Sequence, residues 1–412
     1  MPLTSCMFNV AIYASVSEQI GALSLGDVAS GAAPERFPFP ATEHTAVIIK
    51  RHLMEANELS VADMVEVIGV LGSKEHLPVD DYAPSEDAAA FPTIHAIIVR
   101  KISDHGHPDL DHDGPKEADV DQVRQSTQQT REALIDYLSA PLYGDKLAAE
   151  LVLLHLLARI HTRSNGLVLG KFSLNLKEPT VRSAAFPILS QALGSILPKF
   201  YALPLSLKTL NDHFFFPRGG EGLSSGILQV TKGTSLLLDE TAMEEGTLND
   251  KGVKNVKAIA DLSVYQTLGY VFPFNNLDIS TDVSLLIVSS GSSLIPVDCS
   301  LKLKHIVGEP TIQEVAESRL VEFRKYLSVL RMAEYKFSEE MAQEIETEFM
   351  QQRKEASAKG TPLMTPNELA FNVGLARLVS LSRGDLTLTR EAWTHAKDLA
   401  AQIRSRSNGS SQ

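Results

Sequence analysis

Cysteine is scarce in this chain of 412 residues, which contains only Cys6 and Cys299. Two thiols so far apart in sequence exclude a disulfide framework and a cysteine-based zinc site, and they fit a reducing compartment. Long apolar runs are also missing, because the most apolar helical stretch, 147–160, contains His155 and Arg159 and is too short to span a bilayer. The start of the chain has no basic segment followed by a clean apolar stretch. We therefore expect no signal peptide and no association with a membrane.

Positive charge is in deficit, since 38 Lys and Arg stand against 51 Asp and Glu and give a formal net charge of −13. A protein this acidic repels phosphate backbones unless it carries a segregated basic face. The basic residues are scattered, and runs such as Lys50-Arg51 are only two residues long. Aromatic residues that could stack on bases are also rare between 45 and 101, where only Tyr82 and Phe91 occur. The sequence therefore predicts no direct nucleic-acid binding and favours a protein partner.

The distribution of apolar residues, Gly and Pro divides the chain into blocks. Short β-branched runs at 45–51, 59–71 and 92–101 predict a β-rich N-terminal part. Strand-like and helical runs then alternate, which is typical of an α/β fold, and the last block is helical throughout. We expect a β-rich N-terminal domain (1–102), an acidic linker (103–122), an α/β core (123–310), a helical domain (311–404) and a disordered tail (405–412).

Local signals predict individual elements within these blocks. Ser338 is an N-cap followed by two glutamates, Thr365-Pro366-Asn367-Glu368 is a capping box, and Gly384 is a helix stop. In the core we expect helices at 130–138 and 145–160, and strands at 167–176, 226–230, 234–239 and 283–289.

One of these apolar runs ends in two acids. The run Thr234 to Glu240 places Leu236 to Leu238 before Asp239 and Glu240. P-loop ATPases use such a strand to aim the first acid at magnesium and the second at the attacking water. The pattern is short, and by itself it is more typical of a buried strand with an acidic end.

An ATPase also needs a phosphate-binding loop, and the sequence lacks a good one. The pattern G-x-x-x-x-G-K-[ST] supplies backbone N–H groups, a lysine for the phosphates and a hydroxyl for magnesium. The only candidate, 166–172, has three residues between its glycines instead of four, and Phe172 takes the place of the hydroxyl. Its apolar residues favour a strand over a solvated loop, so Gly170 and Lys171 are interpreted as strand residues. We therefore predict no catalytic residues and no cofactor.

Other reactive side chains carry weaker signals. The segment 104–113 is dense in histidine and aspartate, which bind metals, but Gly106 and Pro108 break it and deprive it of the rigidity that fixes coordination geometry. We interpret it as a solvated linker and predict no metal site. The sequence contains no G-x-S-x-G elbow, Cys299 is interpreted as a core thiol, and His155 as a core histidine with satisfied hydrogen bonds.

A series of short motifs carries a resemblance to a known family. They are Gly144 to Glu150, Leu169 to Phe172, Thr234 to Thr241, Gly246 to Leu248, Gly252 to Val256, and Leu294 to Cys299. Their order and spacing over roughly residues 45–400 resemble the mini-chromosome maintenance (MCM) complex-binding protein family, and the combination is far more specific than any single motif. The N-terminal region of the family is expected to be shortened here.

The resemblance implies a fold. The family is similar to the MCM helicase subunits that it binds, which implies an oligonucleotide-barrel-like (OB-like) N-terminal domain, a degenerate AAA+-like α/β core without a P-loop, and a C-terminal helical lid. Asp239-Glu240 then correspond to the magnesium-binding strand, Ser289-Ser290 replace the asparagine of a sensor strand, and Arg377 corresponds to a lid arginine. Together with Gly170 and Lys171, these residues are expected to be remnants of a degenerate nucleotide site.

The resemblance also implies a function. Members of the family associate with MCM subunits in place of one normal helicase subunit. They act in the nucleus on assembly, supply or unloading of the helicase, during DNA replication and sister-chromatid cohesion. Two alternatives stay open at this point. One is a weakly active AAA+-type ATPase that remodels the helicase through a diverged loop around Gly170 and Lys171, and the other is a single-strand binder that uses the N-terminal barrel.

Overall fold

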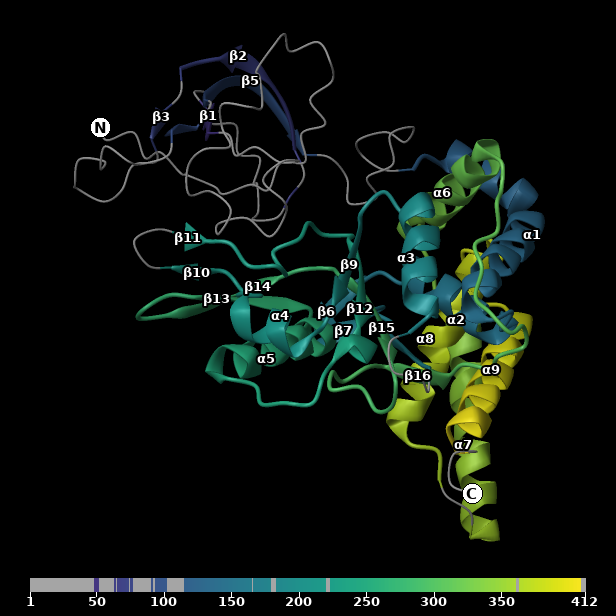
Figure 1. Ribbon diagram of the computed structural model, residues 1–412. Coiled ribbons are helices and arrows are strands. Elements are labelled where there is room, and N and C mark those ends of the chain that lie inside the picture. Colours follow the sequence, from purple (N-terminus) through teal and green to yellow (C-terminus); the bar gives the residue numbers. More distant parts are fainter. Residues whose placement is uncertain are drawn as a thin grey trace.

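The centre of the protein is a parallel β-sheet of five strands (Figure 1). The computed structural model describes residues 48–51, 63, 65–73, 75–76, 90–91, 93–101, 115–164, 166–178, 183–219, 223–360 and 363–408. The strand order is β16-β8-β15-β12-β9, and every neighbouring pair is parallel. The bounds are β8 Leu174–Lys177, β9 Phe200–Pro204, β12 Ser235–Asp239, β15 Ser284–Ser289 and β16 Cys299–Lys302. The predicted α/β class is confirmed.

The apolar runs of the central strands are continuous because both faces of the sheet are buried. Every residue of β12 and β15 is buried. Alternate side chains enter two different hydrophobic cores: Leu237 and Leu286 belong to the first, whereas Leu236 and Ile287 belong to the second. The period of two residues along a strand therefore divides each run between the two faces.

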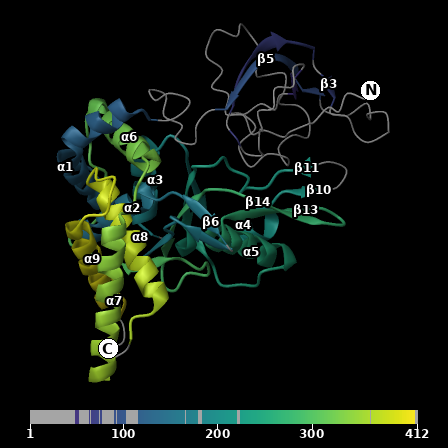
Figure 2. The ribbon, with the colours of Figure 1, turned by 180° about the vertical axis from the view of Figure 1, so that it is seen from behind.

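The helices on the first face form one bundle with a single core. Figures 1 and 2 show this bundle on one side of the sheet. Its first core includes residues of the early helices and of the last block together, so the helical residues after 310 share a core with the helices before the sheet. The bounds are α1 Glu117–Ser139, η2 Ala140–Leu142, α2 Lys146–Leu157, α3 Ala185–Ile196, α6 Glu317–Met332, α7 Glu339–Lys359, α8 Pro366–Ser382 and α9 Arg390–Asn408.

Two predictions at the edges of these helices are wrong. The residues from Glu117 to Gln122, predicted to be linker, belong to α1, which buries Val123 and Thr127 as well as the expected Leu134 and Leu138. The first residues of the predicted disordered tail belong to α9 and include Arg406, which is paired with the buried Asp145. In both cases a polar sequence is ordered because its apolar or charged side chains meet partners far away in the chain.

The second face carries two helices and a smaller sheet. The helices are α4 Leu207–Asp212 and α5 Asp250–Tyr265, and β12 runs into the short η3 Glu240–Ala242. The smaller sheet has the order β11-β10-β13-β14, with β10 Arg218–Gly219, β11 Leu223–Ser224, β13 Thr267–Val271 and β14 Asn276–Ser280. The strand predicted at 226–230 is wrong. This segment is a turn, because the amides of Ile227 and Leu228 bond to the carbonyls of Phe214 and Phe215 and their side chains enter the second core.

The single strand predicted at 167–176 is divided in two. Its first half is β7 Leu167–Leu169, which pairs with β6 Thr162–Ser164 in a separate hairpin, and its second half is β8. Gly170 separates the halves at φ 99°, where a Cβ atom would lie 2.2 Å from the Arg159 carbonyl oxygen. The interpretation of Gly170 and Lys171 as strand residues is therefore wrong, since a backbone turn of this kind needs glycine.

The described part of the N-terminal region is a sheet of three strands in the order β1-β5-β2. The strands are β1 Ile48–Arg51, β2 Val65–Leu71 and β5 Thr93–Lys101, beside a small pair β3 Glu75–His76 and β4 Ala90–Phe91. These positions agree with the three predicted β runs where the two overlap. The remainder of each run and the cluster at 104–113 lie outside the described residues, so the OB-like barrel stays a prediction.

The predicted caps are confirmed. The Ser338 hydroxyl accepts from the Met341 amide at the start of α7, and Thr365 and Glu368 form the reciprocal capping box of α8. Gly384 follows α8 with φ 78°, as expected for a helix stop. Among the described residues no helix combines the length and the apolarity that a membrane crossing requires.

Candidate functional site at the carboxyl edge of the sheet

Gly170 and Lys171 lie before β8 and not after it. The ammonium of Lys171 pairs with the Asp298 carboxylate, whose second oxygen accepts from the Ser173 amide and hydroxyl, both at 2.8 Å. Asp298 directly precedes β16, so this cluster joins the amino ends of two neighbouring parallel strands. A phosphate-binding loop follows its strand and precedes a helix. Lys171 is therefore at the wrong end of β8 for that role.

Asp239 and Glu240 lie at the opposite, carboxyl edge of the sheet. Asp239 ends β12, and its Oδ1 accepts from the Thr241 amide at 2.9 Å and from the Thr241 hydroxyl. Glu240 accepts from the Ser293 hydroxyl at 2.8 Å and from the Leu294 amide at 3.3 Å. Burial raises the pKa of both carboxyl groups, although these hydrogen bonds oppose the shift. Each carboxylate is therefore fixed by its own set of hydrogen-bond donors.

Arg377 lies on the Gly170 side, because its positive charge adds to the burial that lowers the pKa of His161, whose ring packs against Gly170. Arg377 belongs to α8, with its guanidinium 5.5 Å from the centroid of the Tyr335 ring. Burial lowers its pKa, the Tyr335 hydroxyl opposes this, and the positive charge of Arg159 adds to it. The five residues expected to be remnants of one nucleotide site thus fall into different neighbourhoods.

The connection from β8 to α3 contains functional-site residues that the sequence did not predict. Glu178 follows β8 with 0% of its surface exposed, and its carboxylate accepts from the hydroxyls of Tyr143 and Ser183. The Ser183 amide donates to the Thr241 hydroxyl oxygen at 2.7 Å, and that hydroxyl donates to Asp239. We call Tyr143, Glu178, Ser183, Asp239 and Thr241 the carboxyl-edge network.

The network occupies the position where α/β sheets bind ligands, outside the carboxyl ends of the strands. It is anchored to both neighbouring elements: the Glu178 amide donates to the Ser289 carbonyl at 2.8 Å, and the Phe186 amide donates to the Ser183 hydroxyl at 2.9 Å. The amides of Ser183 and Phe186 at the start of α3 are therefore already bonded to hydroxyl oxygens, and the Ser183 hydroxyl itself donates to the buried Glu178 carboxylate. Two carboxylates in this space repel an incoming phosphate.

Charge within the network perturbs its members. Burial, the hydrogen bond to Glu178 and the negative charge of Glu178 all raise the pKa of Tyr143 above its usual value. The charge of Glu178 also adds to the burial that raises the pKa of Asp239. The hydroxyl of Tyr143 therefore remains a proton donor at any physiological pH.

One pattern in the sequence could have indicated this site. The strand Leu174 to Lys177 is followed at once by Glu178, and Arg182-Ser183 precede α3 in the basic-then-hydroxyl order that ends a P-loop. Glycine is absent from this connection in the sequence, and an acid stands at its first position. Residues 179–182 lie outside the described residues.

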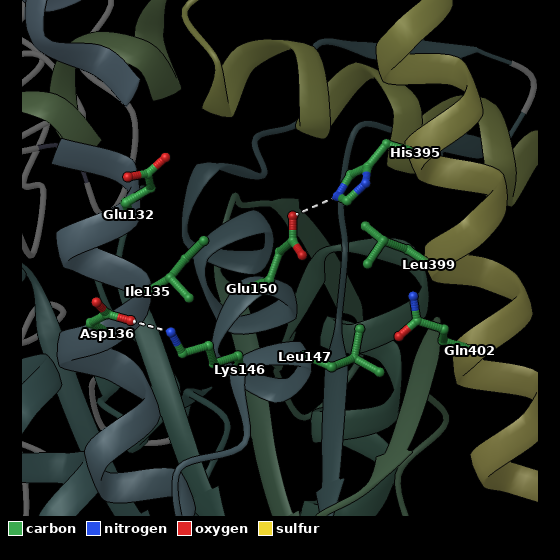
Figure 3. Close-up of a pocket in the computed structure, with 9 residues that line it drawn as sticks. All are labelled: Glu132, Ile135, Asp136, Lys146, Leu147, Glu150, His395, Leu399 and Gln402. Atoms are coloured by element: carbon green, nitrogen blue, oxygen red, sulfur yellow. Dashed lines mark hydrogen bonds and ion pairs between the residues drawn. The ribbon is translucent and has the colours of Figure 1, made fainter. Parts of the chain in front are cut away.

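A pocket of about 420 Å³ lies between α1, α2 and α9 (Figure 3). Its polar centre is Glu150, which bonds His395 at 2.8 Å and also pairs with Arg131. Burial alone would raise the pKa of Glu150, but the hydrogen bond from His395 and the charge of Arg131 hold it below its usual value. The described residues contain no group of three or more His, Cys, Asp or Glu arranged to hold a metal ion.

The carboxyl-edge network makes a testable contribution to stability. Tyr143→Phe removes one donor from the buried Glu178 carboxylate, and we expect the free energy of unfolding to fall by about 2 kcal/mol. Urea denaturation measures this change. The matched control is Tyr265→Phe, because Tyr265 is 53% exposed and should change stability by less than about 0.5 kcal/mol. Equal effects of the two variants would contradict the network.

The fold and the site define a mixed α/β protein with a parallel sheet whose carboxyl edge is occupied by its own side chains. Residues 22–407 match the family model described as mini-chromosome maintenance replisome factor. The chain belongs to this family.

Curated relatives agree with the family model. The mini-chromosome maintenance complex-binding protein of Gallus gallus is 30% identical over 405 residues, which cover 90% of this chain and 63% of the relative. The human protein of the same name is 30% identical over 431 residues, covering 95% and 66%. That of Arabidopsis thaliana is 29% identical over 408 residues, covering 92% and 67%. The chain thus spans about two thirds of the length of these relatives.

Proposed function

We propose that this protein is a non-catalytic binding partner of the MCM replicative helicase. The observation that carries the proposal is the likeness to proteins named mini-chromosome maintenance complex-binding protein, which extends over 90% or more of this chain in the chicken, human and Arabidopsis proteins. The proposed place of action is the nucleus, in assembly, supply or unloading of the helicase during DNA replication and sister-chromatid cohesion.

The proposal includes a fold relation to AAA+ proteins. A parallel sheet with an acidic strand end at Asp239-Glu240, and a strand–loop–helix connection at the same edge, supports a degenerate AAA+-like core with α6 to α9 as its helical lid. Glu178 supports the absence of catalysis, because its buried carboxylate already accepts from the Tyr143 and Ser183 hydroxyls where an incoming phosphate would have to bind.

A binding experiment with separate subunits tests the proposal. The recombinant chain is mixed with each purified MCM subunit and the mixtures are resolved by size-exclusion chromatography. We expect co-elution with at least one subunit. Failure to co-elute with any subunit or subcomplex would refute the proposed function.

The weakly active ATPase is the second candidate, and the adjacent acids Asp239 and Glu240 at a carboxyl strand edge favour it. It predicts ATP turnover by the purified chain that Glu240→Gln abolishes. Our proposal predicts no turnover above the buffer blank, with or without magnesium.

A further inference from the structure

The β13–β14 hairpin exposes a group of large apolar side chains. Phe274, in the turn, is 101% exposed, Leu277 is 51% exposed, and Phe272 and Val271 are 38% and 36% exposed. We call these four residues the hairpin-tip patch. Figures 1 and 2 both show the hairpin projecting from the second face of the molecule, away from the helical bundle. Val271 lies on the opposite face of the hairpin from Leu277, so apolar side chains are exposed on both faces and at the tip. Exposed apolar side chains gathered in this way are typical of an interaction site.

The hairpin is held rigidly in position. Its five strand pairs run in register from Thr267–Ser280 to Val271–Asn276, and the Phe272 amide donates to the Asn275 carbonyl at 2.8 Å. At the base, the Gln266 side chain bonds both the amide and the carbonyl of Val283, at 2.8 and 2.9 Å. A preformed surface loses little conformational entropy on binding, which favours affinity.

Leu277 continues the second hydrophobic core outward. Leu277 is paired across the strands with Tyr270, which is 3% exposed and belongs to that core, and Ile279 packs against the same core. Leu277 lies on the same face of the hairpin as these residues, because side chains alternate along a strand. A ligand that covers Leu277 would therefore extend an existing core.

The outer edge of β14 is also available among the described strands. β14 is the last strand in the order β11-β10-β13-β14. An edge strand presents unpaired N–H and C=O groups, which an extended peptide segment can pair with.

The charged residues on and near the hairpin favour a protein over a nucleic acid as the ligand of this patch. The residues 267–280 include one charged side chain, Asp278, and neither lysine nor arginine. The nearby cations Arg218 and Lys251 are stacked on the Phe214 ring, at 3.9 and 4.4 Å from its centroid. Binding to phosphate backbones or to anionic membranes requires clustered cations. A surface without clustered cations instead matches an apolar segment of a protein.

We propose that the hairpin-tip patch and the edge of β14 form the docking site for an extended apolar segment of an MCM subunit. This inference rests on the proposed function and adds the surface that performs it. The segment pairs with the backbone of β14, covers Leu277 and encloses the Phe274 ring. Aromatic anchors that become fully covered carry much of the binding energy of an interface.

The test measures the affinity of fluorescently labelled full-length chain for the co-eluting MCM subunit. Phe274→Asp is expected to weaken binding by about tenfold or more, because it places a charge where an apolar surface must be covered. The side chain is fully exposed, so the melting temperature should stay unchanged. The control is Met350→Asp, which makes the same kind of change at a 53% exposed position on α7 and should leave the affinity unchanged.

The outcomes separate the two proposals. Equal affinity of wild type and Phe274→Asp would overturn the docking site and leave the proposed function standing. Absence of binding by the wild type would overturn both. Binding of a single-stranded oligonucleotide that Phe274→Asp weakens, or a wild-type dimer that Phe274→Asp dissociates, would assign the patch to a different occupant and overturn the inference.

Discussion

Replacement of Asp145 by alanine is expected to lower the free energy of unfolding by about 3 to 5 kcal/mol. Only 1% of the Asp145 side chain is exposed. It caps α2 by accepting from the Ala148 amide at 3.2 Å, accepts from the Lys304 amide at 3.0 Å, and pairs with Arg406 through both carboxylate oxygens. Its removal leaves the Arg406 guanidinium, only 14% exposed, without its carboxylate.

Urea denaturation of the variant and a matched control measures this effect. Asp136→Ala breaks the ion pair with Lys146, whose side chains are 55% and 73% exposed, and should cost less than about 1 kcal/mol. Truncation after Arg404 removes Arg406 and should also destabilise the protein strongly. A truncated chain as stable as the full chain would contradict the role assigned to this pair.

Acidification is expected to destabilise the protein through His155. This residue is fully buried in α2, and burial lowers its pKa from 6.5 to about 4, although the hydrogen bond to the Phe172 carbonyl opposes the shift. Between these two pH values the unfolded chain binds a proton at His155 and the folded chain does not. The contribution of neutral His155 to the free energy of unfolding is therefore fully present above about pH 6.5. It is lost as the pH is lowered toward 4, by about 3 kcal/mol in total.

The variant His155→Gln isolates this contribution. Glutamine retains an N–H group for the Phe172 carbonyl but does not titrate. We expect the difference in unfolding free energy between pH 7 and pH 4.5 to be smaller in the variant than in the wild type by about 2 to 3 kcal/mol. Parallel pH profiles of the two proteins would show that His155 does not titrate as its burial requires.

Local patterns were sufficient to predict many elements of the fold. The capping box at Thr365, the stop at Gly384 and the apolar run before Asp239 act over a few residues, and their physical causes are complete within the sequence. The failures have distant causes. The segment 226–230 is apolar because it enters a core, and it cannot join a ladder because its amides bond to the carbonyls of 214 and 215.

The candidate site was harder to predict than the fold. The sequence predicts the strand that ends at Asp239, before Glu240. The phosphate-loop pattern contains glycine and lysine, and its nearest match in the sequence is Gly170 and Lys171, at the amino edge of the sheet. Glu178 carries no motif of its own. Its partner Tyr143 is 35 residues away in sequence, and Ser183 meets Thr241 across 58 residues, so only the folded chain brings the network together.

We propose that this chain binds MCM subunits through its own folded surface without a nucleotide. The most direct test is a titration of each purified MCM subunit into the labelled chain, after the chain has been freed of nucleotide with apyrase. We expect saturable binding to at least one subunit, with an affinity that does not change when the chain alone is preincubated with magnesium-ATP. Binding that appears only after this preincubation, or no binding to any subunit, would contradict this proposal.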